Sequence, residues 1–330
     1  MNSINRTTRR YTGLLLALLG GFAPVWTHAQ GSDTPTRLVV AFAAGGPNDI
    51  MARALAEKMR VSLNEPVVVE NRTGAGGIVA TDSVKRAPKD GKTILISSAP
   101  PFVLYPWTYK QLPYNPEADF AAVAHLAEVP LAAFARADSP YQNFSQYLSW
   151  AKDNPASQGI GVVALGGMMH FGVTSMAQTL GQKYFPVPYR GGAAILTDLV
   201  GGNVPLAMDA AATAFEMTKS GKTRFLGVTG TKRSPLLPDV PTFKEQGIGN
   251  FDNASAWYIA FVPSGTPPAR VARLESALIA AAKDVEVQKR MGNLGMVMTG
   301  LPGKEASQLV STQSTYWKPI IAQTGFKADQ

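Results

Sequence analysis

The chain has 330 residues, 45% of them hydrophobic, which is enough for a large core and suggests two domains. Its formal net charge of +8 comes from dispersed lysines and arginines, so the continuous basic face of a nucleic-acid-binding protein is not expected. The chain contains no cysteine, which excludes disulfides and metal sites built on thiolates.

The first residues have the pattern of an export signal. Arginines at positions 6, 9 and 10 precede an apolar stretch at residues 11–23, and Thr27-His28-Ala29 forms a small-x-small cleavage site. The apolar stretch is shorter than the about 20 residues that span a membrane, which favours a cleaved signal over an uncleaved anchor. We therefore expect residues 1–29 to be removed near Ala29 and the mature protein to lie in the periplasm.

After this segment, short apolar runs alternate with helical segments. The first series predicts strands at residues 38–42, 66–70 and 93–97 and helices at residues 49–63 and 77–86. This order is typical of a parallel sheet with helices on both faces. Two further strands are predicted around Val129-Pro130.

A second series repeats the same alternation. It predicts helices at residues 144–154, 169–180, 193–201 and 215–220 and strands at residues 159–165, 184–189, 204–210 and 223–229. A strand at residues 255–263, a helix at residues 267–284 and a helix near residues 303–323 follow. The pattern indicates an α/β protein with two Rossmann-like lobes and a ligand cleft between them. Because ligands in open α/β sheets bind beyond the carboxyl ends of the strands, the strand-to-helix loops are the candidate sites.

The first such loop reads Ala43-Ala44-Gly45-Gly46-Pro47-Asn48-Asp49. Glycines allow a ligand to approach the backbone closely, and free amides at a helix start attract a carboxylate or a phosphate. An ordinary glycine-rich turn capped by Asn48 or Asp49 would explain the same residues. The Gly-x4-Gly-Lys-Ser/Thr string of a phosphate-binding loop is absent from the sequence.

Two later loops repeat the strand, Gly-Gly, helix pattern, in "ALGGMMHFG" (residues 164–172) and "PYRGGAAIL" (residues 188–196). Ser97 and Ser98 end a predicted strand in the first half, and Asp209 ends one in the second half. Three glycine-rich helix starts that converge on one cleft favour an anion site more strongly than any one of them alone.

Catalytic and cofactor motifs are poorly represented. Gly74-x-Gly76 resembles part of a dinucleotide-binding string, but no acidic residue ends the following strand. His125 lies in an apolar stretch that is typical of a structural histidine, and two isolated histidines do not make a zinc site. No known nucleophile or metalloprotease motif is present. We therefore expect no catalytic residue, no metal and no cofactor.

The loops and their surroundings resemble the substrate-binding proteins of tripartite tricarboxylate transporters, also called Bug or TctC-like proteins. The likeness covers nearly the whole mature chain and includes "AFAAGGPNDIMARALAEKM", "PYRGGAAILTDLVGGNVPLAMD" and "WYIAFVPSGTPPARVARLESAL". It implies a receptor with type II-like periplasmic-binding-protein architecture that closes on a small organic carboxylate. Such a receptor would act as a monomer and deliver the ligand to the membrane permease subunits of the transporter.

The resemblance also implies a domain division and a set of ligand contacts. Lobe 1 would comprise residues 30–128 with residues 256–330, and lobe 2 would comprise residues 129–255. The expected contacts come from the loops just described: Phe42, Ala43, Ala44, Gly45, Gly46, Asn48, Asp49, Ser97, Ser98, Gly167, Met168, Met169, His170, Tyr189, Arg190, Gly191, Gly192 and Asp209.

This sequence departs from the usual family pattern in several places. Ala44 stands where proline is common, Pro47-Asn48 where Gly-Thr is common, and Thr73 where proline is common. Met168-Met169 replaces small or hydroxyl residues before the histidine, and methionine makes a cleft more apolar and adaptable. With Phe102 nearby in sequence, this favours an aromatic or otherwise apolar carboxylate over citrate.

Two other functions fit the same residues. An exported hydrolase could use Ser97 or Ser98 with His170. A sensor subunit could present the bound ligand to a membrane kinase, because it would use the same closure.

Overall fold

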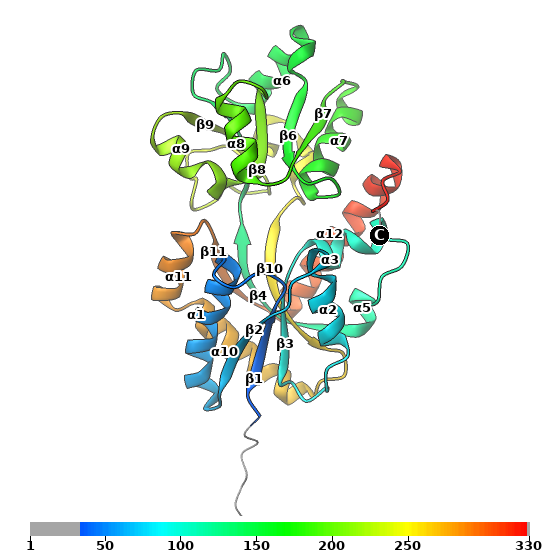
Figure 1. Ribbon diagram of the computed structural model, residues 1–330, viewed down its shortest axis with the longest axis vertical. Coiled ribbons are helices and arrows are strands. Elements are labelled where there is room, and N and C mark those ends of the chain that lie inside the picture. Colours follow the sequence, from blue (N-terminus) through cyan, green and yellow to red (C-terminus); the bar gives the residue numbers. More distant parts are fainter. Residues whose placement is uncertain (1–33, 329–330) are drawn as a thin grey trace, which may run out of the picture. The chain divides into compact units, whose positions relative to one another are not determined.

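The computed structural model describes residues 34–328, and the predicted signal segment lies outside these residues. Two sheets organise the chain (Figure 1). The first sheet has six strands in the order β11-β4-β10-β3-β1-β2. Its strands are β1 (Thr36–Val40), β2 (Val67–Asn71), β3 (Thr93–Ser98), β4 (Phe120–Val129), β10 (Ala256–Pro263) and β11 (Val297–Pro302).

The first three strands of this sheet are parallel, as the βαβαβ pattern predicts. Strand β10 runs antiparallel to both β3 and β4, and β11 is antiparallel to β4. The sheet is therefore mixed. Strand β10, from the C-terminal third of the chain, lies at its centre between β3 and β4, two strands of the N-terminal half.

Helices cover both faces of the first sheet (Figure 1). Successive strand residues point to opposite faces, so Leu38 and Val40 belong to one apolar cluster and Val39 to another. The first cluster is closed by α1 (Pro47–Leu63), α10 (Pro268–Ala282) and α11 (Val285–Gly292). The second includes buried residues of α2 (Ile78–Lys85), α3 (Pro100–Val103) and α12 (Gly303–Thr324). The short helices α4 (Tyr105–Thr108) and α5 (Pro116–Asp119) lie between α3 and β4 in the chain.

The second sheet has five strands in the order β7-β6-β8-β5-β9. Its strands are β5 (Leu131–Arg136), β6 (Gly159–Val163), β7 (Phe185–Tyr189), β8 (Leu206–Ala210) and β9 (Thr223–Val228). Buried residues of α6 (Phe144–Asp153) and α7 (Met168–Leu180) pack in one cluster with this sheet, and those of α8 (Gly192–Val200) pack in another. Helix α9 (Phe215–Lys219) precedes the edge strand β9.

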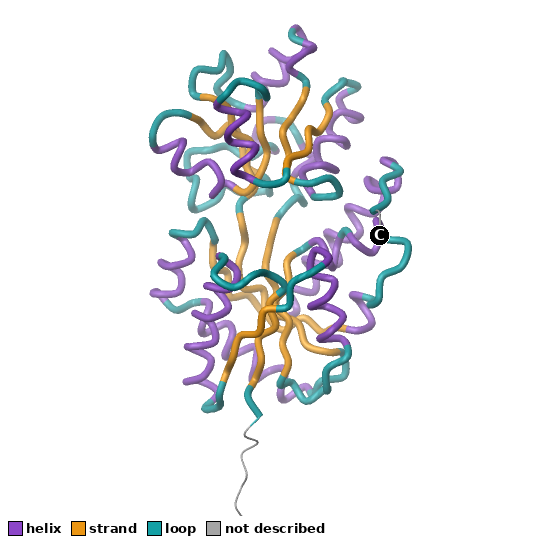
Figure 2. The backbone as a smooth tube through the Cα atoms, in the orientation of Figure 1, coloured by secondary structure: helices purple, strands orange, loops and turns teal. Residues whose placement is uncertain are grey.

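The chain passes between the sheets at Pro130, between β4 and β5, and returns through residues 229–255 into β10 (Figure 2). Helix α12 adds a third connection, because it contacts α7 and the hydroxyl of Tyr316 donates to the carbonyl of Asn250 at 2.7 Å. One apolar cluster contains residues of both sheets. The described residues therefore form a single compact unit.

The main differences from the sequence prediction lie at residues 285–302, for which the pattern predicts no element. Helix α11 is only eight residues long and is capped by Asp284, which accepts hydrogen bonds from the amides of Glu286 and Val287. Strand β11 contains a register shift between Met298 and Leu301, which disturbs the alternation that sequence reading relies on. Both elements are too short or too irregular for periodicity to find.

His125 provides a pH-dependent test of the first sheet. It is buried on β4, its Nε2 atom has no hydrogen-bond partner within residues 34–328, and burial lowers the pKa of its imidazole to about 4. The unfolded chain binds a proton on this imidazole below about pH 6.5, whereas the folded chain binds it only below about pH 4. We expect the folded state to lose up to about 3 kcal/mol as the pH falls from 6.5 to 4. The His125→Gln variant should lack this part of the loss in urea unfolding, and equal losses in both proteins would contradict the prediction.

Glu65 tests the opposite end of the same sheet. Its carboxylate accepts hydrogen bonds from Lys92, from Arg270 at 2.6 Å and from Thr36 at 2.9 Å. Burial opposes its ionisation, but these bonds outweigh burial and lower the pKa of Glu65 to about 2. Removing one member of a buried ion pair is strongly destabilising, so Glu65→Gln should lower the free energy of unfolding by about 3 kcal/mol.

The matched control for this variant is Glu286→Gln. Glu286 pairs with Lys58 at 2.9 Å, but its side chain is 86% exposed. Exposed pairs contribute about 0–1 kcal/mol, so the control should unfold near the wild-type urea concentration. Similar losses in both variants would show that the Glu65 network is no stronger than a surface pair.

Candidate functional site

Three helices begin directly after carboxyl ends of parallel strands: α1 after β1, α7 after β6 and α8 after β7. Their N-cap residues are Gly46, Gly167 and Gly191, and none of them supplies a side-chain cap. The first amides of an α-helix have no acceptor within the helix. These three starts therefore present backbone donors and the positive end of the helix dipole to whatever lies beyond the strands.

The loops before α1 and α7 place a glycine in the same conformation just before the N-cap residue. Gly45 has φ +81° and Gly166 has φ +79°, in the left-handed region that favours glycine. The Gly45 amide donates to Asp49 Oδ2 at 3.0 Å, and the Gly166 amide donates to His170 Nδ1 at 3.1 Å. In each loop, a side chain from the first helical turn folds back and holds the glycine. Asp49 and His170 therefore support the loops from within the protein.

Asp49 is the centre of a larger network. Besides the Gly45 amide, its carboxylate accepts from Arg53 Nε at 2.8 Å and from Asn71 Nδ2 at 3.0 Å. The hydrogen bond from Arg53 is the largest cause that lowers the pKa of Asp49 to about 2, against the effect of burial. Asp49 is consequently ionised and fully engaged with its neighbours.

Asn48, in the same turn, has a side-chain oxygen that accepts no hydrogen bond from the described residues. The residue is only 9% exposed, and its Oδ1 atom has no hydrogen-bond partner among the described residues. Tyr258 of β10 lies nearby: burial raises the pKa of its hydroxyl to about 12, and hydrogen bonding with Asn48 opposes this shift. The ring of Tyr258 also meets Phe42 edge-on, with centroids 6.1 Å apart. Ala43 and Ala44 complete the loop between Phe42 and the glycines.

A pocket of about 190 Å³ lies between the two sheets. Ser98, at the end of β3, lines it from the first sheet together with Ala256, Trp257 and Tyr258 of β10. The second sheet and its loops contribute Leu131, Val163, Met168, Met169, Met208 and Asp209. Four residues predicted from the sequence line this pocket: Ser98, Met168, Met169 and Asp209. Trp257, Tyr258 and Met208 were missed by sequence reasoning, although Trp257 and Tyr258 lie in the quoted string "WYIAFVPSG".

Asp209 is the acidic residue of the pocket. Burial raises the pKa of its carboxyl group, and Thr213 donates to its Oδ2 atom at 2.6 Å. A Cβ atom placed on Gly192 would lie 3.2 Å from the same oxygen, so Asp209 packs against the start of α8. Arg190 and Gly191 precede that start, while the hydroxyl of Tyr189 donates to Asp198 within α8 at 2.9 Å.

Other predicted residues point elsewhere. Ser97 is buried, and its hydroxyl donates to the carbonyl of Ser98. The ring of His170 packs against Phe171 and Phe326, with centroids 4.9 and 5.4 Å away. Within residues 34–328, no hydrogen bond joins Ser97 or Ser98 to His170. The pair that a serine hydrolase would need is therefore not assembled.

Phe102 corrects one sequence expectation. We expected it to make the cleft more apolar, but the residue is 1% exposed and its ring stacks on Phe261 with centroids 3.9 Å apart. It sits in the short helix α3, which inserts into the core of the first sheet. The apolar lining of the pocket comes instead from methionines and from Trp257.

Metal and membrane features were searched over the same residues. No group of three or more histidine, aspartate or glutamate side chains within residues 34–328 could hold a metal ion. No helix in this part of the chain is both long and apolar enough to cross a membrane.

Known proteins resemble this chain in sequence and in fold. The family described as "Tripartite tricarboxylate transporter family receptor" matches residues 51–326. The "UPF0065 protein in tcbD-tcbE intergenic region" of Pseudomonas sp. (strain P51) is 33% identical over 309 residues, covering 92% of this chain and 91% of that protein.

Two solved structures extend the comparison. The periplasmic binding protein BugD is 35% identical with a TM-score of 0.70, over 89% of this chain and 99% of that one. MatC of Rhodopseudomonas palustris, solved with bound malate, is 29% identical with a TM-score of 0.69, over 87% of this chain and 98% of that one. The chain therefore belongs to the tripartite tricarboxylate transporter receptors, a family of periplasmic solute-binding proteins.

Proposed function

We propose that this receptor captures a small organic carboxylate in the pocket between its sheets and delivers it to the permease subunits of a tripartite transporter. The observation that carries the proposal is the set of uncapped helix starts at the carboxyl ends of β1, β6 and β7. Their free amides are donors suited to an anion. The MatC relative with bound malate shows that one structural neighbour holds a carboxylate.

Each part of the site has a distinct task in this proposal. The start of α1 does not line the pocket itself but meets it where Tyr258 approaches Asn48. The ligand carboxylate accepts hydrogen bonds there from the amides of Asn48 and Asp49, since Pro47 has no amide hydrogen. The Oδ1 atom of Asn48, which has no partner in the described part of the chain, accepts from a ligand hydroxyl or from an ordered water. Asp209, at the opposite wall, contacts the far end of the ligand. Thr213 and the start of α8 hold its carboxyl group in place.

Closure of two lobes around the ligand would give the receptor a shape that a membrane partner recognises. We place lobe 1 at residues 30–128 with 256–330 and lobe 2 at residues 129–255, with residues 1–29 as a cleaved signal that directs the chain to the periplasm. Ligand shifts the equilibrium between open and closed forms only by its higher affinity for the closed form. Hinged closure around a ligand is a known motion of two-lobed binding proteins.

The lining of the pocket indicates the ligand's chemistry. Met168, Met169, Met208 and Trp257 supply apolar surface, and methionine adapts to ligands of different shape. Three carboxylates of a tricarboxylate would require more polar partners than Ser98, Tyr258 and Asp209 provide. We therefore propose an aromatic or otherwise apolar carboxylate in preference to citrate.

This ligand class can be tested by thermal shift and calorimetry with terephthalate, a phenolic acid, malate and citrate. Ligand that binds only the native state stabilises it by about 2.7 kcal/mol at 100 times Kd. We expect the aromatic acids to raise the Tm most and citrate least. A Tm increase with citrate alone would overturn the proposed ligand class and leave the receptor function intact.

Gly46 tests the docking of the ligand on backbone amides. Gly46 has an extended conformation, and a Cβ atom there would lie 3.5 Å from the carbonyl of Ala43, so a side chain fits without strain. Gly46→Leu should block the approach of any ligand to the start of α1 and weaken binding at least tenfold, which is about 1.4 kcal/mol.

Gly249→Leu is the matched control, because Gly249 is exposed and nothing lies within 4 Å of a Cβ atom there. Calorimetry should give wild-type affinity for this control. Unchanged affinity in Gly46→Leu, with an unchanged Tm, would count against docking at α1.

A further inference from the structure

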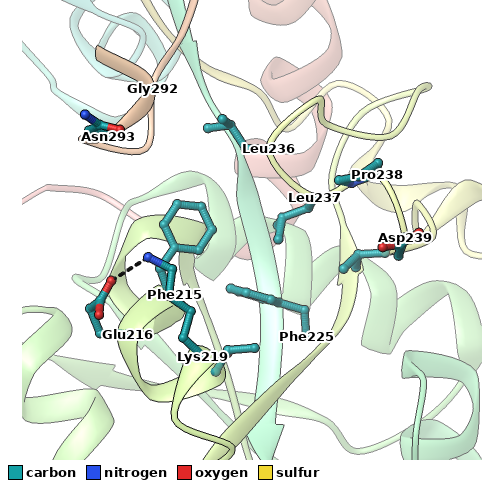
Figure 3. Close-up of a pocket in the computed structure, with 12 residues that line it drawn as sticks. Phe215, Glu216, Lys219, Phe225, Leu236, Leu237, Pro238, Asp239, Gly292 and Asn293 are labelled. Atoms are coloured by element: carbon teal, nitrogen blue, oxygen red, sulfur yellow. Dashed lines mark hydrogen bonds and ion pairs between the residues drawn. The ribbon is translucent and has the colours of Figure 1, made fainter. Parts of the chain in front are cut away.

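A second and larger pocket lies away from the proposed carboxylate site (Figure 3). Its volume is about 660 Å³, and its lining comes from α9, from β9, from the loop at residues 236–240 and from residues 292–293 at the end of α11. None of these residues lines the pocket that contains Ser98 and Asp209. A molecule in one pocket therefore contacts none of the residues that line the other.

The floor of this second pocket is aromatic. Phe215 and Phe225 meet edge-on, with centroids 5.8 Å apart and ring planes at 79°. Phe225 also contacts the fully buried Phe134, with centroids 6.2 Å apart, so its ring is anchored in the core of the second sheet. In Figure 3, Leu236 and Leu237 face the same space as the two rings. This arrangement offers apolar surface and ring edges to a flat aromatic molecule.

The opposite wall comes from a distant part of the chain. Gly292 and Asn293, at the end of α11, line the pocket across from α9. The adjacent Gly295 packs closely there: a Cβ atom on it would lie 2.5 Å from Ala212 Cβ and 3.4 Å from Phe215 Cε2. The wall is therefore in contact with the floor.

The charged side chains that line this pocket carry one more negative charge than positive charges. Lys219 donates to Glu216 at 2.8 Å, so these two side chains neutralise each other. Asp239 is exposed, and within residues 34–328 it forms no ion pair. One negative charge is left beside an aromatic and aliphatic surface. A ligand with a ring and one positive charge would match both features.

From this combination we propose that the pocket lined by Phe215, Phe225 and Asp239 binds an arylalkylamine, a molecule with an aromatic ring and one alkylammonium group. The ring of the amine contacts Phe215, Phe225 and Leu237, and its ammonium group lies beside Asp239. The ligand class is thus opposite in charge to the carboxylate proposed for the other pocket.

Three probes separate the ring from the charge: tryptamine carries both, indole carries the ring alone and butylamine carries the charge alone. Calorimetric titration of the full-length mature protein should give saturable binding of tryptamine, weaker binding of indole and no measurable binding of butylamine. Equal binding of tryptamine and butylamine would overturn the proposal. All three probes lack a carboxylate, so this outcome is separate from that of the proposed receptor function.

Variants then assign the binding to this pocket. Asp239→Asn should weaken tryptamine binding about threefold and leave indole unchanged, as expected for loss of one exposed charge pair. Asp239→Lys should remove the advantage of tryptamine over indole. The matched control Asp153→Asn alters an equally exposed aspartate at the end of α6, outside the pocket, and should change neither affinity.

Phe225→Ala tests the ring contact and should weaken both tryptamine and indole about tenfold, the typical scale for truncating a central aromatic contact. The Tm of Phe225→Ala shows whether the core beneath the ring is retained. If this variant is destabilised, the Asp239 variants test the site instead, because Asp239 is exposed. A preference for tryptamine that persists in Asp239→Lys would overturn the assignment.

Discussion

The structure depends on one constraint: the first turn of an α-helix has amide groups that the helix itself cannot satisfy. In α1, α7 and α8 the chain leaves these amides without a side-chain cap, because glycine occupies each N-cap position. Placing such starts at the carboxyl ends of parallel strands gathers backbone donors where α/β proteins bind ligands. Backbone donors need no particular side chain, so a family built on them can change the residues around the ligand without losing the contact to its charge.

The starts of α1 and α7 are stabilised by the same kind of hydrogen bond, although the two helices pack on different sheets. In each, a glycine in the left-handed region donates its amide to a side chain three residues past the N-cap, which is Asp49 in one loop and His170 in the other. The acceptors differ in charge and surroundings. Asp49 is ionised and paired with Arg53, whereas His170 packs between aromatic rings, one of which is Phe326 beyond α12. The two loops therefore share a glycine conformation and a hydrogen bond to it, but differ in electrostatics.

Helix α12 links the two halves beyond the two chain crossings. Gln313 accepts from the indole of Trp257 at 2.8 Å and donates to Ser255, and Tyr316 reaches the carbonyl of Asn250. Trp257 itself lines the pocket between the sheets. A residue of the pocket is thus held by a helix from the end of the sequence. The C-terminal helix therefore helps to position a residue of the pocket, which its place in the chain does not suggest.

The sequence by itself determined the alternating strands and helices, the three Gly-Gly helix starts and the family resemblance, because these features reside in local periodicity and short strings. It also identified four residues of the pocket lining: Ser98 and Asp209 near the carboxyl ends of β3 and β8, and Met168 and Met169 at the start of α7. Only the tertiary structure placed Trp257 and Tyr258 in the pocket, since β10 pairs with β3 and β4 across a long stretch of sequence. It also buried Phe102 against Phe261 and brought residues 292–293 to face α9. Such contacts depend on which distant segments pair, and no local pattern in the chain encodes that pairing.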